Sequence, residues 1–167
     1  MRALDPSAWR GRDVLLVAPH PDDEAIGAGA TAHLAARAGA RVVPVICTTG
    51  DGGVGADGAR GEDRQAESRR ACSLLGIGEP VFLGLSSPDL RDDPAAGART
   101  LAAGVGRERF DVVLAPWPLE RHDTHRASLL AAAWSGAARP GAEWLGWGVW
   151  DAIPAFEDVA EVDATAG

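Results

Sequence analysis

The feature that most constrains the fold of this chain is a regular alternation of short apolar, valine-rich runs with alanine-rich stretches of helical period. Because parallel strands need crossover connections, this alternation predicts βαβ units and a mainly parallel sheet. We therefore expect a doubly wound α/β fold that forms a single domain over residues 1–167. The expected strands are residues 14–18, 42–48, 81–83, 112–115 and 145–150. The expected helices are residues 26–38, 60–75, 95–107 and 125–138.

Polar residues gather after the first and the fourth of these strands. Residues 18–24 read Ala-Pro-His-Pro-Asp-Asp-Glu, and residues 116–126 read Pro-Trp-Pro-Leu-Glu-Arg-His-Asp-Thr-His-Arg. In the usual strand order 3-2-1-4-5 the first and fourth strands are neighbours, and ligands bind beyond their carboxyl ends, where the crossovers change sides of the sheet. The topology thus predicts that three of the four histidines meet in one crevice.

These residue types suit a catalytic metal. A catalytic zinc ion has three protein ligands and one open position, and His20, Asp23 and His125 can supply that set. Asp22 is then the carboxylate that takes a proton from the attacking water. His122, three residues before His125, can stabilise an oxyanion or give a proton to a departing amine. The pattern predicts metal-assisted amide hydrolysis with Zn²⁺, although the same ligands also suit iron, cobalt or nickel.

Other residues near these motifs have two explanations each. Glu24 either orients a metal ligand from behind it or only helps the helix to start. Arg64 is either a substrate contact or half of a surface ion pair with Glu67.

Trp117 is placed to stack on a sugar, whereas Trp144, Trp147 and Trp150 are expected to pack in the protein interior. His33 is expected to be a packed or surface histidine, and the glycine-rich run after residue 50 is either a lid or only a turn.

Charge and composition narrow the choice of partners. The net charge of −8 disfavours nucleic acid and anionic membrane surfaces, so a small molecule is the expected partner. The sequence shows no apolar segment of transmembrane length and no signal-peptide pattern, and a cytoplasmic location is expected. Cys47 and Cys72 lack metal-site spacing and are expected to be buried, reduced thiols.

The two motifs together resemble the PIG-L/LmbE family of zinc-dependent de-N-acetylases, whose hallmarks are an (A/P)-H-P-D-D-E run and a later H-x-x-H. The resemblance covers roughly residues 12–163 and includes the segments 49–53, 64–67 and 81–85. It implies a Rossmann-like fold and removal of acetyl from an N-acetylglucosaminyl unit of a glycoconjugate. It also implies that zinc is held by His20, Asp23 and His125, that Asp22 is the general base, and that His122 stabilises the intermediate.

The chain departs from the family pattern at three points. After residues 83–85 the family usually has Asp-Gly, whereas this chain reads Ser-Ser-Pro-Asp, so a substrate contact is expected either to be absent or to have moved to Asp89. There is no tyrosine to supply a hydroxyl in the transition state. The sequence stops at Gly167, where relatives usually continue, so a compact or truncated member is expected.

The predicted function is metal-dependent removal of an N-acetyl group from an amino sugar or its conjugate. Arg64, Asp89 and Trp117 are the expected substrate contacts. Two alternatives stay open at this point. One is a metal-dependent amidase of a thiol conjugate on the same fold, and the other is a non-catalytic binding domain with a reduced pocket.

Overall fold

Strand β2 (Asp13–Ala18) lies at the centre of a five-stranded sheet and is buried along nearly its whole length. The computed structural model describes residues 2–3, 6–50, 61–149 and 160–161. All pairings in the main sheet are parallel, and the strand order is β4-β3-β2-β5-β6. This order confirms the predicted 3-2-1-4-5 arrangement. The other four strands are β3 (Arg41–Thr48), β4 (Val81–Leu85), β5 (Phe110–Pro116) and β6 (Ala138–Trp147).

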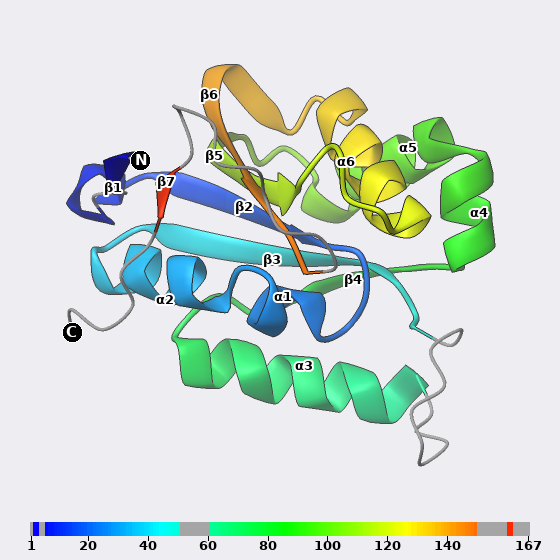
Figure 1. Ribbon diagram of the computed structural model, residues 1–167, viewed down its shortest axis with the longest axis horizontal. Coiled ribbons are helices and arrows are strands. Elements are labelled where there is room, and N and C mark those ends of the chain that lie inside the picture. The colour runs from blue at the N-terminus through cyan, green and yellow to red at the C-terminus, as the bar shows by residue number, and fades with distance from the viewer. Residues whose placement is uncertain (1, 4–5, 51–60, 150–159, 162–167) are drawn as a thin grey trace.

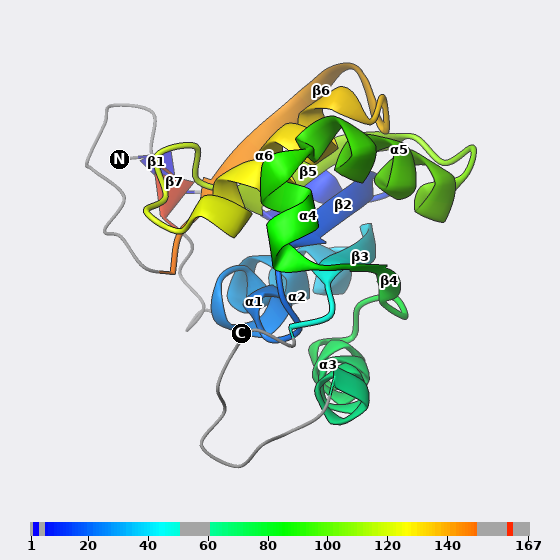
Figure 2. The same cartoon turned by 90° about the vertical axis from the view of Figure 1, so that its right-hand side faces the viewer.

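Helices cover both faces of the sheet (Figures 1 and 2). On one face lie α1 (Asp23–Ile26), α2 (Gly29–Arg37) and α3 (Gly61–Leu75). On the other face lie α4 (Ser87–Asp92), α5 (Pro94–Val105) and α6 (Asp123–Trp134). The crossovers therefore change sides between β2 and β5, as a doubly wound sheet requires.

The alternation of side chains along β2 explains the two cores. Val14 and Leu16 point into a core shared with α2, whereas Leu15 and Val17 point into a core shared with α4, α5 and α6. All four side chains are fully buried. Because successive strand residues face opposite sides, a continuous apolar run is what a strand covered on both faces needs.

The expected helix over residues 26–38 is instead two helices, with a break at Gly27 and Ala28. Gly27 keeps helical dihedral angles, and the backbone departs from them at Ala28, with φ −126° and ψ 4°. A Cβ atom at Gly27 would overlap the indole ring of Trp147, the last residue of β6. The ring therefore packs directly against the backbone next to the break.

Other boundaries differ from the sequence expectations for local reasons. Helix α4 lies where none is expected, and Ser86 caps it by accepting a hydrogen bond from the Asp89 N–H at 3.1 Å. Helix α6 ends at Trp134, because Gly136 adopts φ +70°, and β6 starts at Ala138 rather than at residue 145. Three short elements are also additional to the expected ones: β1 (Arg2–Ala3), β7 (Ala160–Glu161) and the 3₁₀ helix η1 (Pro6–Trp9). Over the described ranges, no helix has both the length and the apolar character needed to cross a bilayer.

We expect Gly27→Ala to lower the free energy of unfolding by about 1–3 kcal/mol, because the added methyl group displaces Trp147. Gly29→Ala is the matched control, since its Cβ would meet other atoms no closer than 3.6 Å. The control should stay within about 1 kcal/mol of wild type, on the stabilising side. Urea denaturation measures both variants. Equal stability of the two would contradict the packing described for Trp147.

Cys47 and Cys72 are buried and unbridged, as predicted. Burial raises the pKa of each thiol to about 12, and nearby negative charge adds to the effect. The raised pKa keeps each thiol in its protonated, less reactive form. We expect the native protein to resist a disulfide reagent at pH 8 and to react at both cysteines in denaturant. Rapid labelling of the native protein would show that one thiol is accessible.

Candidate active site

The loop that follows β2 is held in an unusual backbone conformation. Asp22 has φ 140°, and it is the one non-glycine residue with positive φ in the described part of the chain. Such a conformation costs about 1–3 kcal/mol and needs support from its surroundings. Thr48 supplies part of it, because its N–H and hydroxyl donate to the Pro19 carbonyl at 2.9 and 2.8 Å. Glu24 adds to it: its side chain is fully buried, and its Oε2 accepts the Asp22 N–H at 2.9 Å.

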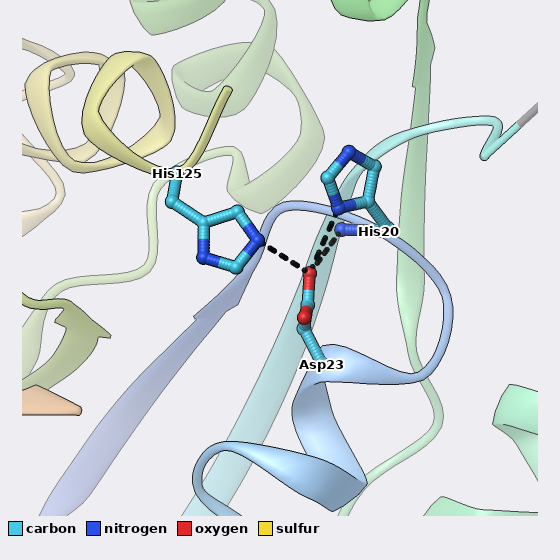
Figure 3. Close-up of side chains that lie close together, drawn as sticks. All are labelled: His20, Asp23 and His125. Carbon is cyan, nitrogen blue, oxygen red and sulfur yellow. Dashed lines mark hydrogen bonds and ion pairs between the residues drawn. The ribbon is translucent and has the colours of Figure 1, made fainter. Parts of the chain in front are cut away.

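His20, Asp23 and His125 come together at the carboxyl ends of β2 and β5 (Figure 3). Asp23 Oδ2 accepts the backbone N–H of His20 at 2.9 Å and lies 3.0 Å from His20 Nδ1. The same oxygen lies 3.4 Å from His125 Nε2. One ligand atom from each residue lies within 4.8 Å of the others. The strand order therefore juxtaposes these three residues, as expected.

The buried environment of this group fits a cation. His125 is fully buried; among the described residues its Nδ1 has no hydrogen-bond partner, and its Nε2 has only the 3.4 Å contact with Asp23 Oδ2. Burial alone would raise the pKa of Asp23, but His125 and His20 outweigh it and hold the pKa well below its usual range. A buried imidazole without a partner is costly, whereas a nitrogen lone pair beside an ionised carboxylate is a ready metal ligand. Two nitrogens and one oxygen form a donor set that zinc accepts.

Asp22 lies beside this group and is held by Arg64 of α3. Arg64 Nη2 donates to Asp22 Oδ2 at 2.9 Å and to the Pro21 carbonyl at 3.0 Å, and Nη1 donates to the Gly50 carbonyl at 2.5 Å. The guanidinium thus faces the loop after β2 rather than Glu67 on its own helix. Burial and the charge of Asp23 raise the pKa of Asp22, while Arg64 and His20 oppose the rise.

His122 completes a triangle of imidazoles. It is the N-cap residue of α6, and its ring centroid lies 5.2 Å from that of His20 and 4.8 Å from that of His125. Partial burial lowers the pKa of His122, and the two neighbouring imidazoles lower it further. The preceding loop is fixed by Arg126, whose Nη1 donates to the Glu120 and Arg121 carbonyls at 2.5 and 3.0 Å.

A cavity of about 530 Å³ opens over these side chains, a volume typical of small-molecule sites. His125 is not part of its lining and lies behind it. The lining includes five of the predicted site residues and six that were not predicted. The predicted ones are His20, Asp22, Asp23, Arg64 and His122, and the others are Ile26, Ser87, Pro88, Arg91, Thr124 and Val149.

Two expected substrate contacts lie outside this lining. Asp89 is exposed in the first turn of α4. Trp117 packs against Gly146 of β6, where an added Cβ would lie 2.9 Å from its Cε3 atom. The Trp117 N–H donates to the Trp147 carbonyl at 2.6 Å. The substrate roles of Asp89 and Trp117 stay predictions.

The tryptophans of β6 and His33 differ in how far they are packed. Trp147 is 7% exposed and lies near His125, with ring centroids 5.8 Å apart and an interplanar angle of 66°. It therefore packs as predicted and also touches a candidate ligand, a contact that the sequence does not signal. Trp144 is 42% exposed, so the packing expected for it is only partial. His33 Nδ1 lies 2.9 Å from the Leu75 carbonyl, consistent with a packed histidine. Residues 51–60 and Trp150 lie outside the described residues.

Sequence comparison identifies a family that spans most of the described chain. The family described as PIG-L: GlcNAc-PI de-N-acetylase matches residues 15–134. This segment contains the first motif, Arg64 and both histidines of the second motif.

Individual relatives agree with this match. A protein of Thermobifida fusca named 1D-myo-inositol 2-acetamido-2-deoxy-alpha-D-glucopyranoside deacetylase is 39% identical over 100 residues, which are 53% of this chain and 35% of the relative. The conserved protein TT1542 of Thermus thermophilus superposes with TM-score 0.70 and 26% identity, over 86% of this chain and 69% of that one. N,N'-diacetylchitobiose deacetylase of Pyrococcus horikoshii gives TM-score 0.55 and 28% identity, over 74% and 49%. The chain thus spans about a third of the curated relative's length.

We expect His20→Ala and His125→Ala to weaken zinc binding by at least about a hundredfold, because each removes a direct ligand. The fourth histidine supplies the control, since His33 lies apart from the cluster. His33→Ala should keep the metal content of wild type. Elemental analysis after dialysis, followed by competition with a chelating dye, measures the effect. If His125→Ala retained wild-type affinity, this residue would not be a ligand.

Proposed function

This chain belongs to the PIG-L family of GlcNAc-PI de-N-acetylases, and from that premise we propose that it hydrolyses the acetamide of an N-acetylated amino sugar or its conjugate with the help of zinc. One observation carries the proposal. A carboxylate that is not part of the ligand group, Asp22, lies beside His20, Asp23 and His125 in a cavity of small-molecule size. The name of the Thermobifida fusca relative supports an acetamido sugar as the substrate.

His20, Asp23 and His125 would hold the metal. A divalent ion bound there supplies a Lewis acid, which polarises the acetamide carbonyl and acidifies water. Asp23 is suited to this role because its lowered pKa favours the ionised carboxylate, and His125 because, among the described residues, its buried Nε2 has no partner besides Asp23.

Asp22 acts as the general base and then as the general acid. Arg64 engages its Oδ2, which leaves Oδ1 to accept a proton from the water that attacks the acetamide carbon. A pKa raised above the usual range makes this carboxylate a better base than an exposed aspartate. Asp22 then returns the proton to the nitrogen as the C–N bond breaks, so that acetate and a free amine leave.

His122 stabilises the negative charge that develops on the carbonyl oxygen. Its lowered pKa favours a neutral ring in the resting site. A neutral imidazole still carries one N–H, and a donor held in place before the reaction stabilises an oxyanion without having to reorganise.

Asp22→Asn should retain zinc and lose about 10²- to 10⁴-fold in turnover, because it removes the proton acceptor and leaves the ligand group intact. Asparagine tolerates positive φ and can still accept the Arg64 hydrogen bond, so the loop should keep its shape. The measurements are bound zinc and the release of free amine from N-acetylglucosamine and its glycosides.

Asp92→Asn is the matched control, because this exposed aspartate of α4 does not line the cavity. It should match wild type in both measurements. Full activity of Asp22→Asn would remove Asp22 from the mechanism. The proposed substrate class would be overturned if the wild-type protein bound zinc and cleaved an amide in a thiol conjugate but cleaved no acetamido sugar.

A further inference from the structure

Among the described residues, Arg64 and Arg91 are the arginines that line the cavity, and their surroundings differ. The Arg64 guanidinium is occupied by Asp22 and by two backbone carbonyls. Arg91 is exposed, and across the described residues its guanidinium has neither a hydrogen bond nor an ion pair. The cavity therefore holds a cation whose charge is not balanced by the described part of the protein.

Nearby carboxylates do not neutralise Arg91. Asp93 caps α5, where its Oδ1 accepts the Ala96 N–H at 2.9 Å, and its Oδ2 lies 3.7 Å from Arg99. Asp89 and Asp92 are exposed and do not line the cavity. Other exposed arginines also have no ion pair among the described residues, and what distinguishes Arg91 from Arg107 is that it lines the cavity.

Helix α4 presents Arg91 together with a hydroxyl group. Ser87 and Arg91 are four residues apart, so they lie on one face of α4, and both line the cavity. The helix packs beside α6 (Figure 2). The same cavity is lined by Asp22, Asp23 and His122. Helix α4 therefore supplies part of the wall of the cavity that also contains the candidate catalytic residues.

We propose that Arg91, assisted by the Ser87 hydroxyl, binds an anionic group of the substrate, a carboxylate or a phosphate. The inference rests on the proposed function, since it specifies which acetamido sugars the site prefers. A guanidinium forms paired hydrogen bonds with carboxylates and phosphates. A substrate anion would therefore supply the partner that Arg91 does not have among the described residues.

The test compares sugars that differ in charge. Zinc-loaded protein is assayed with N-acetylglucosamine, with its 1-phosphate and 6-phosphate, and with N-acetylmuramic acid, which distinguishes phosphate from carboxylate. We expect kcat/KM to be at least about tenfold higher for one or more of the anionic sugars. Arg91→Gln should abolish this preference, because it lowers kcat/KM for the anionic sugar much more than for the neutral sugar. Arg91→Lys should be intermediate, because it keeps the charge and loses the paired hydrogen bonds.

Arg107→Gln is the control, since this arginine is exposed and lies outside the cavity lining. It should leave the preference unchanged. Equal kcat/KM for neutral and anionic sugars in wild type would overturn the role of Arg91. So would an equal loss on both kinds of sugar in Arg91→Gln.

Calorimetric binding of the same sugars to the Asp22→Asn protein separates this inference from the proposed function. The role of Arg91 is supported if the Asp22→Asn protein binds an anionic sugar more tightly than a neutral one and if adding Arg91→Gln removes this difference. This result supports the role of Arg91 even if the wild-type protein cleaves no acetamide and the proposed activity fails. Binding with no dependence on charge, or no binding of any of the sugars, overturns it.

Discussion

The pairing of β2 with β5 is the constraint on which the site depends. The two strands are parallel neighbours with Leu16 opposite Leu114, so the loops that follow them emerge side by side. The pairing is secured on both faces, because alternate residues of β2 enter two separate apolar cores. Without this adjacency His20 and Asp23 would have no His125 beside them, although each loop would still have its own local hydrogen bonds.

Two successive aspartates show how this arrangement assigns different chemistry to one residue type. Asp23 lies between two imidazoles, which lower its pKa, whereas burial raises the pKa of Asp22 even with Arg64 beside it. Neighbouring carboxylates whose pKa values move in opposite directions are suited to different tasks, one as a permanent anion and the other as a proton carrier. The positive φ of Asp22 is part of this arrangement. A positive φ is unfavourable for a residue other than glycine, and here hydrogen bonds from Thr48 and Arg64 and to Glu24 hold the loop in this conformation.

The sequence was sufficient for the strand order and for the grouping of His20, Asp23 and His125, because both follow from periodicity and from the edge at which parallel strands end. It was insufficient wherever a distant residue decides the local structure. Gly27 looks like an unfavourable helix residue in the sequence, and only the ring of Trp147, brought there by the last strand of the sheet, explains why this position has no room for a side chain. From the sequence alone, Arg64 could equally be half of a surface ion pair or a site residue. The sequence does not decide between the two, because the three acceptors of the Arg64 guanidinium lie in two other loops. Helix α4 does have a local signal, the Ser86 cap followed by Pro88, but serine and proline are equally typical of a turn.

Trp147 lies at the end of the edge strand β6 and close to the candidate ligand His125. After a register shift near its start, strand β6 pairs with β5 continuously from Glu143 opposite Val112 to Trp147 opposite Pro116, so the ladder carries Trp147 to the carboxyl end of β5, where further contacts hold it. Those contacts include the Trp117 N–H bonded to the Trp147 carbonyl and the indole packed against Gly27 and close to His125. An apolar ring beside a buried imidazole keeps water away from it, and electrostatic interactions of the site are stronger when water is excluded. The last strand of the sheet therefore takes part in shaping the surroundings of His125, although it supplies none of the three candidate ligands.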